Sequence, residues 1–463
     1  MSEMNTVEKA QDQLMAFAIA WLARWSGQDP GALLKYWPGA DGQALEPYRP
    51  LLGTFGAPTE PGSALLSIFS RVRDPFGGVE PTAHYWQPQE LSLEHVPVPA
   101  QEATVSESTL AGWWKGFEQD AAALLERPAS AGARFEMFTH LLHKWAWAVP
   151  CSYGEPGVSA YDEVRALSAL VHASGCAEQP ASEFLLVAGD IPGIQSFVYT
   201  ITSKGAAKGL RGRSFFIQLL GDAVVRRLLA ELSLPQTNVI YTAGGNFMLL
   251  AQSALTQVNG EAVEDKLARI QQEIDKALLS DFEGDLSICL AWADLRSDQL
   301  GSHGFADPVS RELKRLIADK KRQRFSTICE QQWNSLFGPR GEPGNRYCVI
   351  CQRPLSRGEG VPMVDDVAPP QEEQARRCSV CDGFQKLAES LGRPGLLATG
   401  LRRPHTTGEA WQEALWQVGR TWFSFGSYTE LAQLSENSLY TVNDTNFLKS
   451  DAQIVSLLSV AGR

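Results

Sequence analysis

The chain has 463 residues, of which 44% are hydrophobic, and its formal net charge is −12 at pH 7. This length accommodates two to four domains, and the apolar content is that of a folded globular protein and not of a disordered one. The negative charge argues against a protein that coats nucleic acid non-specifically, although a local basic face remains compatible with it.

Neither a membrane segment nor a secretion signal is expected. The longest apolar runs, such as Leu65–Phe69, are far shorter than the roughly 20 residues that a spanning helix needs. The N-terminus MSEMNTVEKAQDQ lacks the basic-then-apolar order of a signal peptide. We therefore expect a cytoplasmic protein that makes no membrane contact.

Residues 1–178 predict a mainly helical domain. Apolar side chains recur at three- and four-residue spacing over Ala16–Trp25, Leu110–Leu125 and Phe135–Ala148. His140 and His143 share a helix face, but no neighbouring carboxylate completes a metal site, so we interpret them as structural. No His-Asp pair occurs in the sequence, which argues against an HD-type phosphohydrolase.

Residues 179–335 predict a βαββαβ unit. The expected elements are a strand at 184–187, a glycine- and base-rich loop, an amphipathic helix, a hairpin of 239–241 and 247–250, a helix over about 261–279 and a strand at 286–292. The hairpin turns at Gly244-Gly245. This is the layout of the ferredoxin-like palm of polymerases and nucleotide cyclases, and the overall fold class expected is α+β.

The number of carboxylates in this unit determines whether it can hold the metal ions needed for phosphoryl transfer. Palms that transfer phosphoryl groups use several carboxylates to hold two cations about 3.5–4 Å apart. Asp190 ends the first predicted strand, but Asn246 and Phe247 follow the two glycines of the hairpin. One carboxylate and one neutral amide make a poor Mg²⁺ site. We therefore expect a palm that shapes a pocket, and we assign no catalytic residue.

Two basic clusters have open interpretations. Lys204, Lys208, Arg211 and Arg213 lie among glycines beside a predicted strand end, where backbone amides and cations suit phosphate oxygens. The alternative is a crossover turn whose glycines serve packing and whose basic residues meet a neighbouring subunit. The second cluster, within residues 311–324, is equally compatible with a solvated helix face.

Four of the eight cysteines form two C-x-x-C pairs, Cys348/Cys351 and Cys378/Cys381, in the segment 336–395. Four thiolates at this spacing give a closed tetrahedral zinc site, which is structural and not catalytic. The intervening residues are rich in proline and glycine, so metal binding would stabilise them. Cys289 lies in an apolar strand and is expected to be core.

Residues 396–463 predict a helical or mixed C-terminal segment. An aromatic stripe, Trp411, Trp416, Trp422 and Phe425, is expected on a helix, and an amphipathic stretch, Asp451–Val460, follows. The stripe is interpreted as core or interface and not as a platform for stacking bases.

Taken together, these residues resemble the large subunit of type III CRISPR effector complexes, of the Csm type. The resemblance rests on GDIPGIQSFVYTITSKGAAKGLRGRSFFIQLL (189–220), NVIYTAGGNFMLL (238–250) and the four cysteines. Fainter agreement occurs in LLSIFSRV (65–72), HYWQPQELSLE (84–94) and VPCSYGEPGVSAYDEVRALSALV (149–171).

The resemblance implies an HD nuclease domain, a first palm, a zinc region and a second palm with a GGDD motif that makes cyclic oligoadenylate from ATP. This chain departs from that pattern. Glu163 stands where SAYDEVRA should carry a family histidine, and no GGDD occurs, since Asp365-Asp366 lies between the cysteine pairs. The N-terminal domain is therefore interpreted as a degenerate HD-like domain.

The resemblance thus implies the scaffold half of a split or truncated large subunit. Its expected partners are other effector subunits, CRISPR RNA, target RNA and a second polypeptide bearing GGDD. A composite ATP and Mg²⁺ pocket would use Asp190, Gly193, Gln195, the Lys204–Arg213 loop and Gly244-Gly245. Three alternatives stay open: a stand-alone palm-type cyclase or polymerase, a nuclease with a degenerate HD site, and a zinc-stabilised RNA-binding module outside CRISPR.

Overall fold

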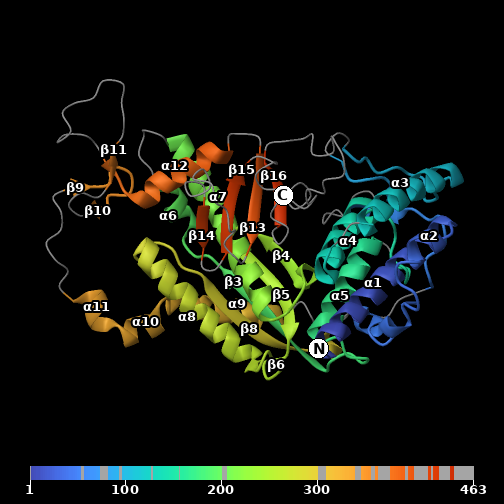
Figure 1. Ribbon diagram of the computed structural model, residues 1–463, viewed down its shortest axis with the longest axis horizontal. Coiled ribbons are helices and arrows are strands. Elements are labelled where there is room, and N and C mark those ends of the chain that lie inside the picture. Colours follow the sequence, from blue (N-terminus) through green and yellow to red (C-terminus); the bar gives the residue numbers. More distant parts are fainter. Residues whose placement is uncertain are drawn as a thin grey trace.

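The computed structural model describes residues 2–53, 57–72, 82–92, 96–126, 129–155, 157–200, 206–300, 309–338, 346–355, 360–362, 376–391, 395–400, 415–418, 421–426 and 438–442. A group of helices forms one end of the molecule and a four-stranded antiparallel sheet its centre (Figure 1). A small region with four cysteines lies at the opposite end, and a second four-stranded sheet contacts a helix of the central unit (Figure 1).

The N-terminal helices occur where the apolar spacing predicts them. The longer ones are α1 (Ser2–Ser26), α3 (Glu107–Leu125), α4 (Ala131–Ala146) and α5 (Ala160–Ala173). The serine before each of α3, α4 and α5 accepts a hydrogen bond from the backbone N–H three residues later, which fixes where these helices begin. Shorter elements connect them: α2 (Gly31–Leu34), η1 (Gln43–Leu45), η2 (Arg49–Leu52), β1 (Leu65–Leu66), η3 (Ile68–Arg71) and β2 (Tyr85–Trp86).

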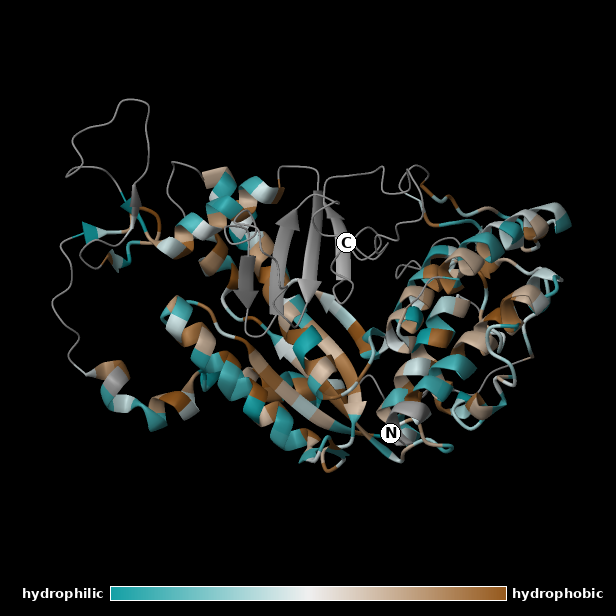
Figure 2. Cartoon of the chain, viewed as in Figure 1, coloured by the Kyte–Doolittle hydropathy of each residue, from teal (hydrophilic) through white to brown (hydrophobic). Residues whose placement is uncertain are grey.

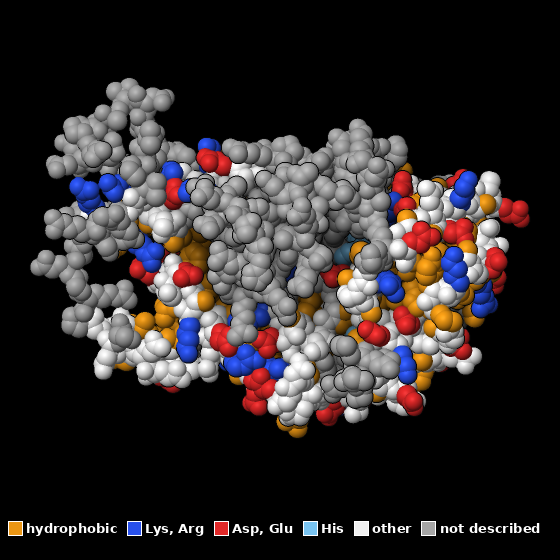
Figure 3. Space-filling model, in the orientation of Figure 1, with side chains coloured by type: hydrophobic (Ala, Val, Ile, Leu, Met, Phe, Trp, Pro, Cys, Tyr) orange, Lys and Arg blue, Asp and Glu red, His pale blue; other side chains and the backbone are white. Residues whose placement is uncertain are grey.

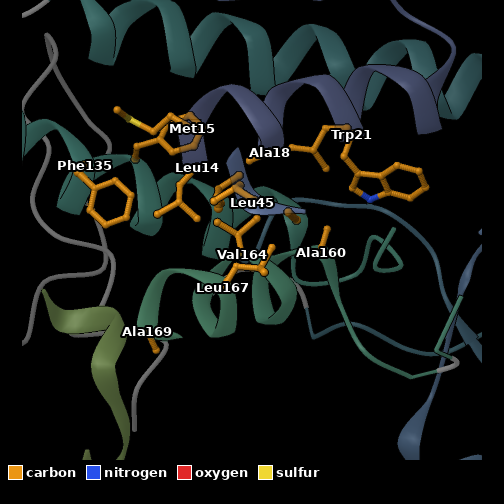
Figure 4. Close-up of a cluster of buried hydrophobic side chains, with 14 of the residues drawn as sticks. Leu14, Met15, Ala18, Trp21, Leu45, Phe135, Ala160, Val164, Leu167 and Ala169 are labelled. Atoms are coloured by element: carbon orange, nitrogen blue, oxygen red, sulfur yellow. The ribbon is translucent and has the colours of Figure 1, made fainter. Parts of the chain in front are cut away.

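These helices bury a common apolar core. Leu14 and Met15 of α1, Phe135 of α4 and Leu167 of α5 are each at most 2% exposed and lie close together (Figure 4). The central strands are coloured mainly hydrophobic, whereas the N-terminal helices alternate between hydrophobic and hydrophilic residues (Figure 2). The mainly helical character predicted for this part is confirmed.

The central unit, which is the sheet together with its connecting helices, has the predicted order of strand, helix, two strands, helix and strand. Its elements are β3 (Glu183–Asp190), α6 (Ile194–Tyr199), α7 (Ala206–Glu231), η4 (Gln236–Asn238), β4 (Val239–Ala243), β5 (Asn246–Gln252), β6 (Gln257–Val258), β7 (Glu261–Ala262), α8 (Val263–Phe282) and β8 (Cys289–Arg296). The strand order in space is β4-β5-β3-β8, with every neighbouring pair antiparallel. Strands β3, β4 and β5 extend beyond the predicted bounds because backbone pairing continues past the apolar runs, whereas β8 begins three residues later than predicted and ends four residues later.

Side chains from two helices cover the backbone at both edges of this sheet. On edge strand β8, Gln271 of α8 accepts a hydrogen bond from Leu290 N (2.7 Å) and donates one to Ile288 O just before it (2.8 Å). At the other edge, Arg165 of α5 donates hydrogen bonds to the carbonyls of Val239 and Ile240. These side chains satisfy part of the backbone at each edge, which leaves less of it open to pairing with another chain.

After the central unit, three helices lead into the cysteine region, which in its described part contains two short strand pairs and one helix. After β8 come η5 (Ser297–Gln299), α9 (Ser310–Arg322), α10 (Ser326–Gln331) and α11 (Trp333–Phe337). Two small antiparallel pairs follow, β9 (Arg346–Tyr347) with β10 (Pro354–Leu355) and β11 (Val361–Pro362) with β12 (Arg376–Arg377), and then α12 (Ser379–Leu391). Helix α12 packs against α7, so this region is joined to the central unit.

The helix predicted for the aromatic stripe is wrong where the structure describes it. Trp416 lies in β14 (Leu415–Val418), and Trp422 and Phe425 lie in β15 (Thr421–Gly426), which pairs with β13 (Gly395–Gly400). Aromatic and β-branched residues favour strands, and this propensity outweighs a loose helical spacing. A fourth strand is β16 (Ser438–Val442). Trp411 and Asp451–Val460 lie outside the described residues.

Among the described helices, none combines the length and apolarity needed to cross a bilayer. On the visible described surface, acidic and basic side chains are intermingled (Figure 3).

The buried carboxylate of Glu163 provides a test of the helical end. Glu163 is 1% exposed and accepts hydrogen bonds from the backbone N–H of Ser152 (2.6 Å) and from the Ser152 hydroxyl. Burial raises the pKa of this carboxyl above its ordinary value of 4.5, although the Ser152 hydrogen bonds oppose the rise. Folding therefore favours the protonated form, whose stabilisation is complete below pH 4.5 and is lost as pH rises through the raised pKa.

We predict that Glu163→Gln is at least as stable as the wild type near pH 7, because the amide stays neutral, can accept from Ser152 N–H and can donate to its hydroxyl. Glu163→Ala leaves the Ser152 N–H without an acceptor and should cost about 1–3 kcal/mol. Urea unfolding above pH 4.5, followed by tryptophan fluorescence, measures both, and Glu163→Gln should show the weaker pH dependence. Exposed Glu60→Gln is the control; equal losses for the two Glu163 variants would contradict the assignment.

Candidate functional site

One end of the central sheet brings together five of the residues that the sequence marks for nucleotide binding. Asp190 ends β3, and Gly244 and Gly245 form the β4–β5 turn with φ values of 60° and 82°. Ile191 N donates to Gly245 O at 2.9 Å, which joins the two segments. Gly193 (φ 78°) and exposed Gln195 follow at α6. We call Asp190, Gly193, Gln195, Gly244 and Gly245 the sheet end.

The carboxylate of Asp190 is already paired with a cation of the chain. Lys321 Nζ of α9 lies 2.6 Å from Asp190 Oδ2, and the two side chains are 38% and 17% exposed. Directly opposite Asp190 in the β3–β5 ladder is Asn246, a neutral amide. Lys321 belongs to the basic cluster within residues 311–324, but its pairing with Asp190 was not predicted, because a pairing between residues so far apart in the sequence leaves no local pattern.

The next hairpin position cannot hold a metal ion. Phe247 is 1% exposed, and a Cβ added to Gly189 would meet its Cζ at 2.0 Å, so the ring lies directly against the glycine. Gly189 is thus required by this close approach. The position where a palm would carry a second carboxylate is part of the apolar core.

Further charged groups surround the pair. Burial raises the pKa of Asp275 on α8 to about 6, although a hydrogen bond from Gln271 and the charge of Lys320 oppose the rise. Burial also raises the pKa of Cys289, which faces Asp190 across the β3–β8 ladder, to about 11. Cys289 is 3% exposed and is therefore core, as predicted.

The basic residues of the predicted phosphate loop do not join the sheet end as a loop. Residues 206–213 belong to helix α7, so the prediction of a loop is wrong over this part, and Lys204 lies outside the described residues. Lys208 pairs with Glu389 of α12 (2.8 Å) and Arg211 is exposed. Leucine and phenylalanine around the glycines continue the helix here, and the glycines allow close packing.

Arg213 is 4% exposed and is not available to a phosphate group. Its guanidinium donates to the carbonyl of Phe197 (2.7 Å) and to the sulfur of Cys381 (3.4 Å). Its assignment to a nucleotide pocket is therefore corrected: the side chain lies between α7 and the cysteine region.

The four cysteines form one cluster. The sulfur atoms of Cys348, Cys351, Cys378 and Cys381 all lie within 4.8 Å of one another, and Cys351 Sγ is 3.7 Å from Cys378 Sγ. Backbone N–H groups of Cys378 and Cys381 donate to the sulfurs of Cys348 (3.3 Å) and Cys378 (3.4 Å). Three of the four are at most 2% exposed, and none forms a disulfide.

This donor set fits a tetrahedral metal ion. Sulfurs bound to zinc at about 2.3 Å are about 3.8 Å apart, whereas disulfide sulfurs are about 2.05 Å apart. In the described part of the chain, these cysteines are the one group of three or more His, Cys, Asp or Glu residues close enough to hold a metal. The sheet end has no such group there.

The two helical histidines are packed inside the helical end. Burial lowers the pKa of His140 to about 3, and it also lowers the pKa of His143, whose ring stacks on Tyr161 with centroids 4.5 Å apart. Burial thus disfavours the protonated form of both rings, which agrees with the structural interpretation of this pair.

Comparisons with known proteins agree with the motifs. Residues 183–339 match the family described as Csm1 subunit domain B. The chain is 28% identical over 334 residues to the CRISPR system single-strand-specific deoxyribonuclease Cas10/Csm1 (subtype III-A) of Thermococcus onnurineus, which covers 69% of this chain and 39% of that protein. It is 33% identical over 180 residues to the Mycobacterium tuberculosis protein of the same description, covering 36% and 21% of the two chains. The chain thus spans well under half of these relatives.

Solved structures share the fold. The Csm1-Csm4 subcomplex of the type III-A CRISPR-Csm interference complex matches with a TM-score of 0.61 and 20% identity, over 91% of this chain and 55% of that chain. A Csm1-Csm4 cassette in complex with cA4 matches with a TM-score of 0.54 and 22% identity, over 74% and 52%. A Csm1-Csm4 cassette in complex with one ATP matches with a TM-score of 0.55 and 23% identity, over 69% of this chain and 49% of that chain.

The motifs, the domain match over the central unit, the curated relatives and the shared fold all agree. The chain is therefore a homologue of the Cas10/Csm1 large subunits of type III-A CRISPR systems.

Proposed function

We propose that the chain is a cytoplasmic scaffold subunit of a type III RNA-guided effector complex. Its curated homologues are Cas10/Csm1 subunits, and structures of its fold contain Csm1 together with Csm4. In this role the chain holds neighbouring subunits around CRISPR RNA and target RNA, while base pairing with the guide supplies sequence specificity.

The proposal includes a composite ATP pocket. The sheet end would form one wall of it, and the metal-holding carboxylates would come from a partner palm that bears Gly-Gly-Asp-Asp, a motif that these 463 residues lack. Cassettes of the same fold have ATP or cA4 bound, which supports a nucleotide role for this region. The accessible contributors at the sheet end are Gln195, Gly193 and the Gly244-Gly245 turn.

The observation that carries the scaffold assignment is the ion pair between Lys321 and Asp190 opposite Asn246. A divalent ion needs several anionic oxygens, whereas here one carboxylate already faces an ammonium group. The ammonium group of Lys321 already contacts Oδ2 of Asp190, so that oxygen has a cationic partner within the chain. The sheet end can therefore orient a nucleotide through hydrogen bonds but cannot itself hold two ions for phosphoryl transfer.

The four-cysteine cluster is proposed as a structural zinc site. Four sulfur ligands complete the coordination of zinc and leave no open position for water or substrate. Bound zinc would hold the short pairs β9–β10 and β11–β12 against α12, where few apolar contacts are available. The zinc ion would only hold these elements in place and would take no part in catalysis.

The first prediction from this proposal concerns catalysis by the isolated chain. The purified 463-residue protein, incubated with ATP and Mg²⁺ or Mn²⁺, should give no oligoadenylate by liquid chromatography and mass spectrometry. In an assembly with a GGDD-bearing partner, Asp190→Ala should lower the rate by no more than about fivefold. A part-exposed ion pair contributes only about 1 kcal/mol, and that free energy converts to about this factor.

Asp294→Ala is the matched control, because Asp294 is an exposed aspartate on β8 of the same sheet. Metal-dependent synthesis by the isolated chain, abolished by Asp190→Ala and retained by Asp294→Ala, would instead establish a stand-alone cyclase or polymerase.

The second prediction concerns metal content. The chain purified without added chelator should contain one zinc ion per molecule by inductively coupled plasma mass spectrometry. Cys378→Ser should lower the content to near zero and lower the thermal unfolding temperature. Cys329→Ser, which changes a cysteine outside the cluster, should do neither. Equal zinc content in Cys378→Ser and the wild type would exclude the four-cysteine site.

A further inference from the structure

Arg213 occupies an unusual position for a charged side chain. It lies on the face of α7 that meets α12 and is 4% exposed. One terminal nitrogen donates to Phe197 O of α6 at 2.7 Å, and the other donates to Cys381 Sγ at 3.4 Å. A single guanidinium thus connects α6, α7 and the cysteine cluster.

Two aromatic rings hold this guanidinium in place. Its central carbon lies 5.0 Å from the ring centroid of Phe197 and 5.1 Å from that of Phe384. The two rings meet edge to face, with centroids 5.6 Å apart and planes at 90°. Cation–π contacts of this kind are strongest when desolvated, as here.

The neighbouring glycine makes the contact possible. A Cβ added to Gly212 would meet the carbonyl oxygen of Phe384 at 1.9 Å, so α7 and α12 approach at backbone distance. Only glycine permits this approach, which brings Cys381 within reach of Arg213. The Gly212-Arg213 dipeptide is therefore fitted to the cysteine region.

The charge of Arg213 needs an anionic partner. Within the described residues, no carboxylate oxygen lies within 4.0 Å of its guanidinium, whereas Arg377 in the same region pairs with Asp382 at 2.6 Å. A buried unpaired cation is costly. Four thiolates around a divalent ion carry a net charge of −2, and the sulfur of Cys381 is the part of that cluster to which Arg213 donates.

We propose that Arg213 is a hydrogen-bond donor to the metal-bound thiolate of Cys381 and the link through which metal binding positions α6. This inference rests on the proposed metal site. Helix α6 is the segment that follows Asp190: Phe197 N donates to Gly193 O at 3.0 Å, and Ile191 N donates to Gly245 O at 2.9 Å. The cysteine region therefore positions the sheet end through the contact of Arg213 with Phe197. Arg213 is a positioning residue.

The test uses the full 463-residue chain loaded with Co²⁺, whose sulfur-to-metal charge-transfer bands report on the thiolates. A hydrogen bond withdraws electron density from sulfur, so Arg213→Leu should move these bands to longer wavelength. Metal affinity, measured by competition with a chelator, should fall by about 10–100-fold, the range found when partners of metal ligands are removed. Arg211→Leu removes an exposed arginine from the same helix and should change neither quantity.

Hydrogen exchange of residues 190–200 provides the second readout. In the wild type, chelation should raise exchange in this segment; in Arg213→Leu, exchange should already be raised with metal bound and should change little on chelation. Arg213→Lys guards against a folding defect, because a lysine cannot bridge both acceptors with a fixed fork. It should fold and bind metal while leaving α6 more exchangeable than in the wild type.

Failure of the metal site and failure of the Arg213 link would give different results. A wild-type chain that binds no metal would overturn the proposed metal site and this link together. A wild type that binds metal, with the charge-transfer bands and the protection of residues 190–200 unchanged in both Arg213 variants, would overturn the link alone.

Discussion

Strand β3 is the constraint on which the rest of the structure depends. It pairs with β5 and β8 along its whole length, so its backbone is satisfied on both sides. Its side chains alternate between two cores: Phe184, Leu186 and Ala188 pack with the N-terminal helices, and Leu185 and Val187 pack with α7 and α8. A shift of one residue would exchange these two sets, and it would move Asp190 away from Asn246 and Lys321.

This constraint connects the fold to the proposed role. Because β3 ends at Asp190, the position of that carboxylate is set by two cores and not by a flexible loop. It faces an ammonium group from α9 on one side and an amide from β5 on the other. The carboxylate is therefore well positioned, but with an amide and an ammonium group as its neighbours it is a poor ligand set for metal ions. The cysteine region is connected to this end of the sheet through α12, α7 and the hydrogen bonds of Arg213.

Local patterns account for the features that could be predicted. The apolar run before Asp190, the Gly244-Gly245 turn and the two C-x-x-C pairs each act over a few residues, where spacing determines geometry. The Lys321 pairing and the Arg213 link join segments distant in the sequence, so they depend on packing that no single stretch encodes. Arg213 was expected in a glycine- and base-rich loop that contacts phosphate or a neighbouring subunit, but α7 begins at Ala206 and buries it. In the C-terminal segment, the strand propensity of Trp416 and Trp422 outweighed their apparent helical spacing.

The most direct test of the central claim is affinity purification of the tagged chain from its native host, with identification of bound proteins by mass spectrometry and sequencing of bound RNA. The account predicts recovery of CRISPR RNA, other effector subunits and a Gly-Gly-Asp-Asp palm in the same assembly. Recovery of the chain with neither CRISPR RNA nor effector subunits would contradict it and would favour a zinc-stabilised module that works outside CRISPR.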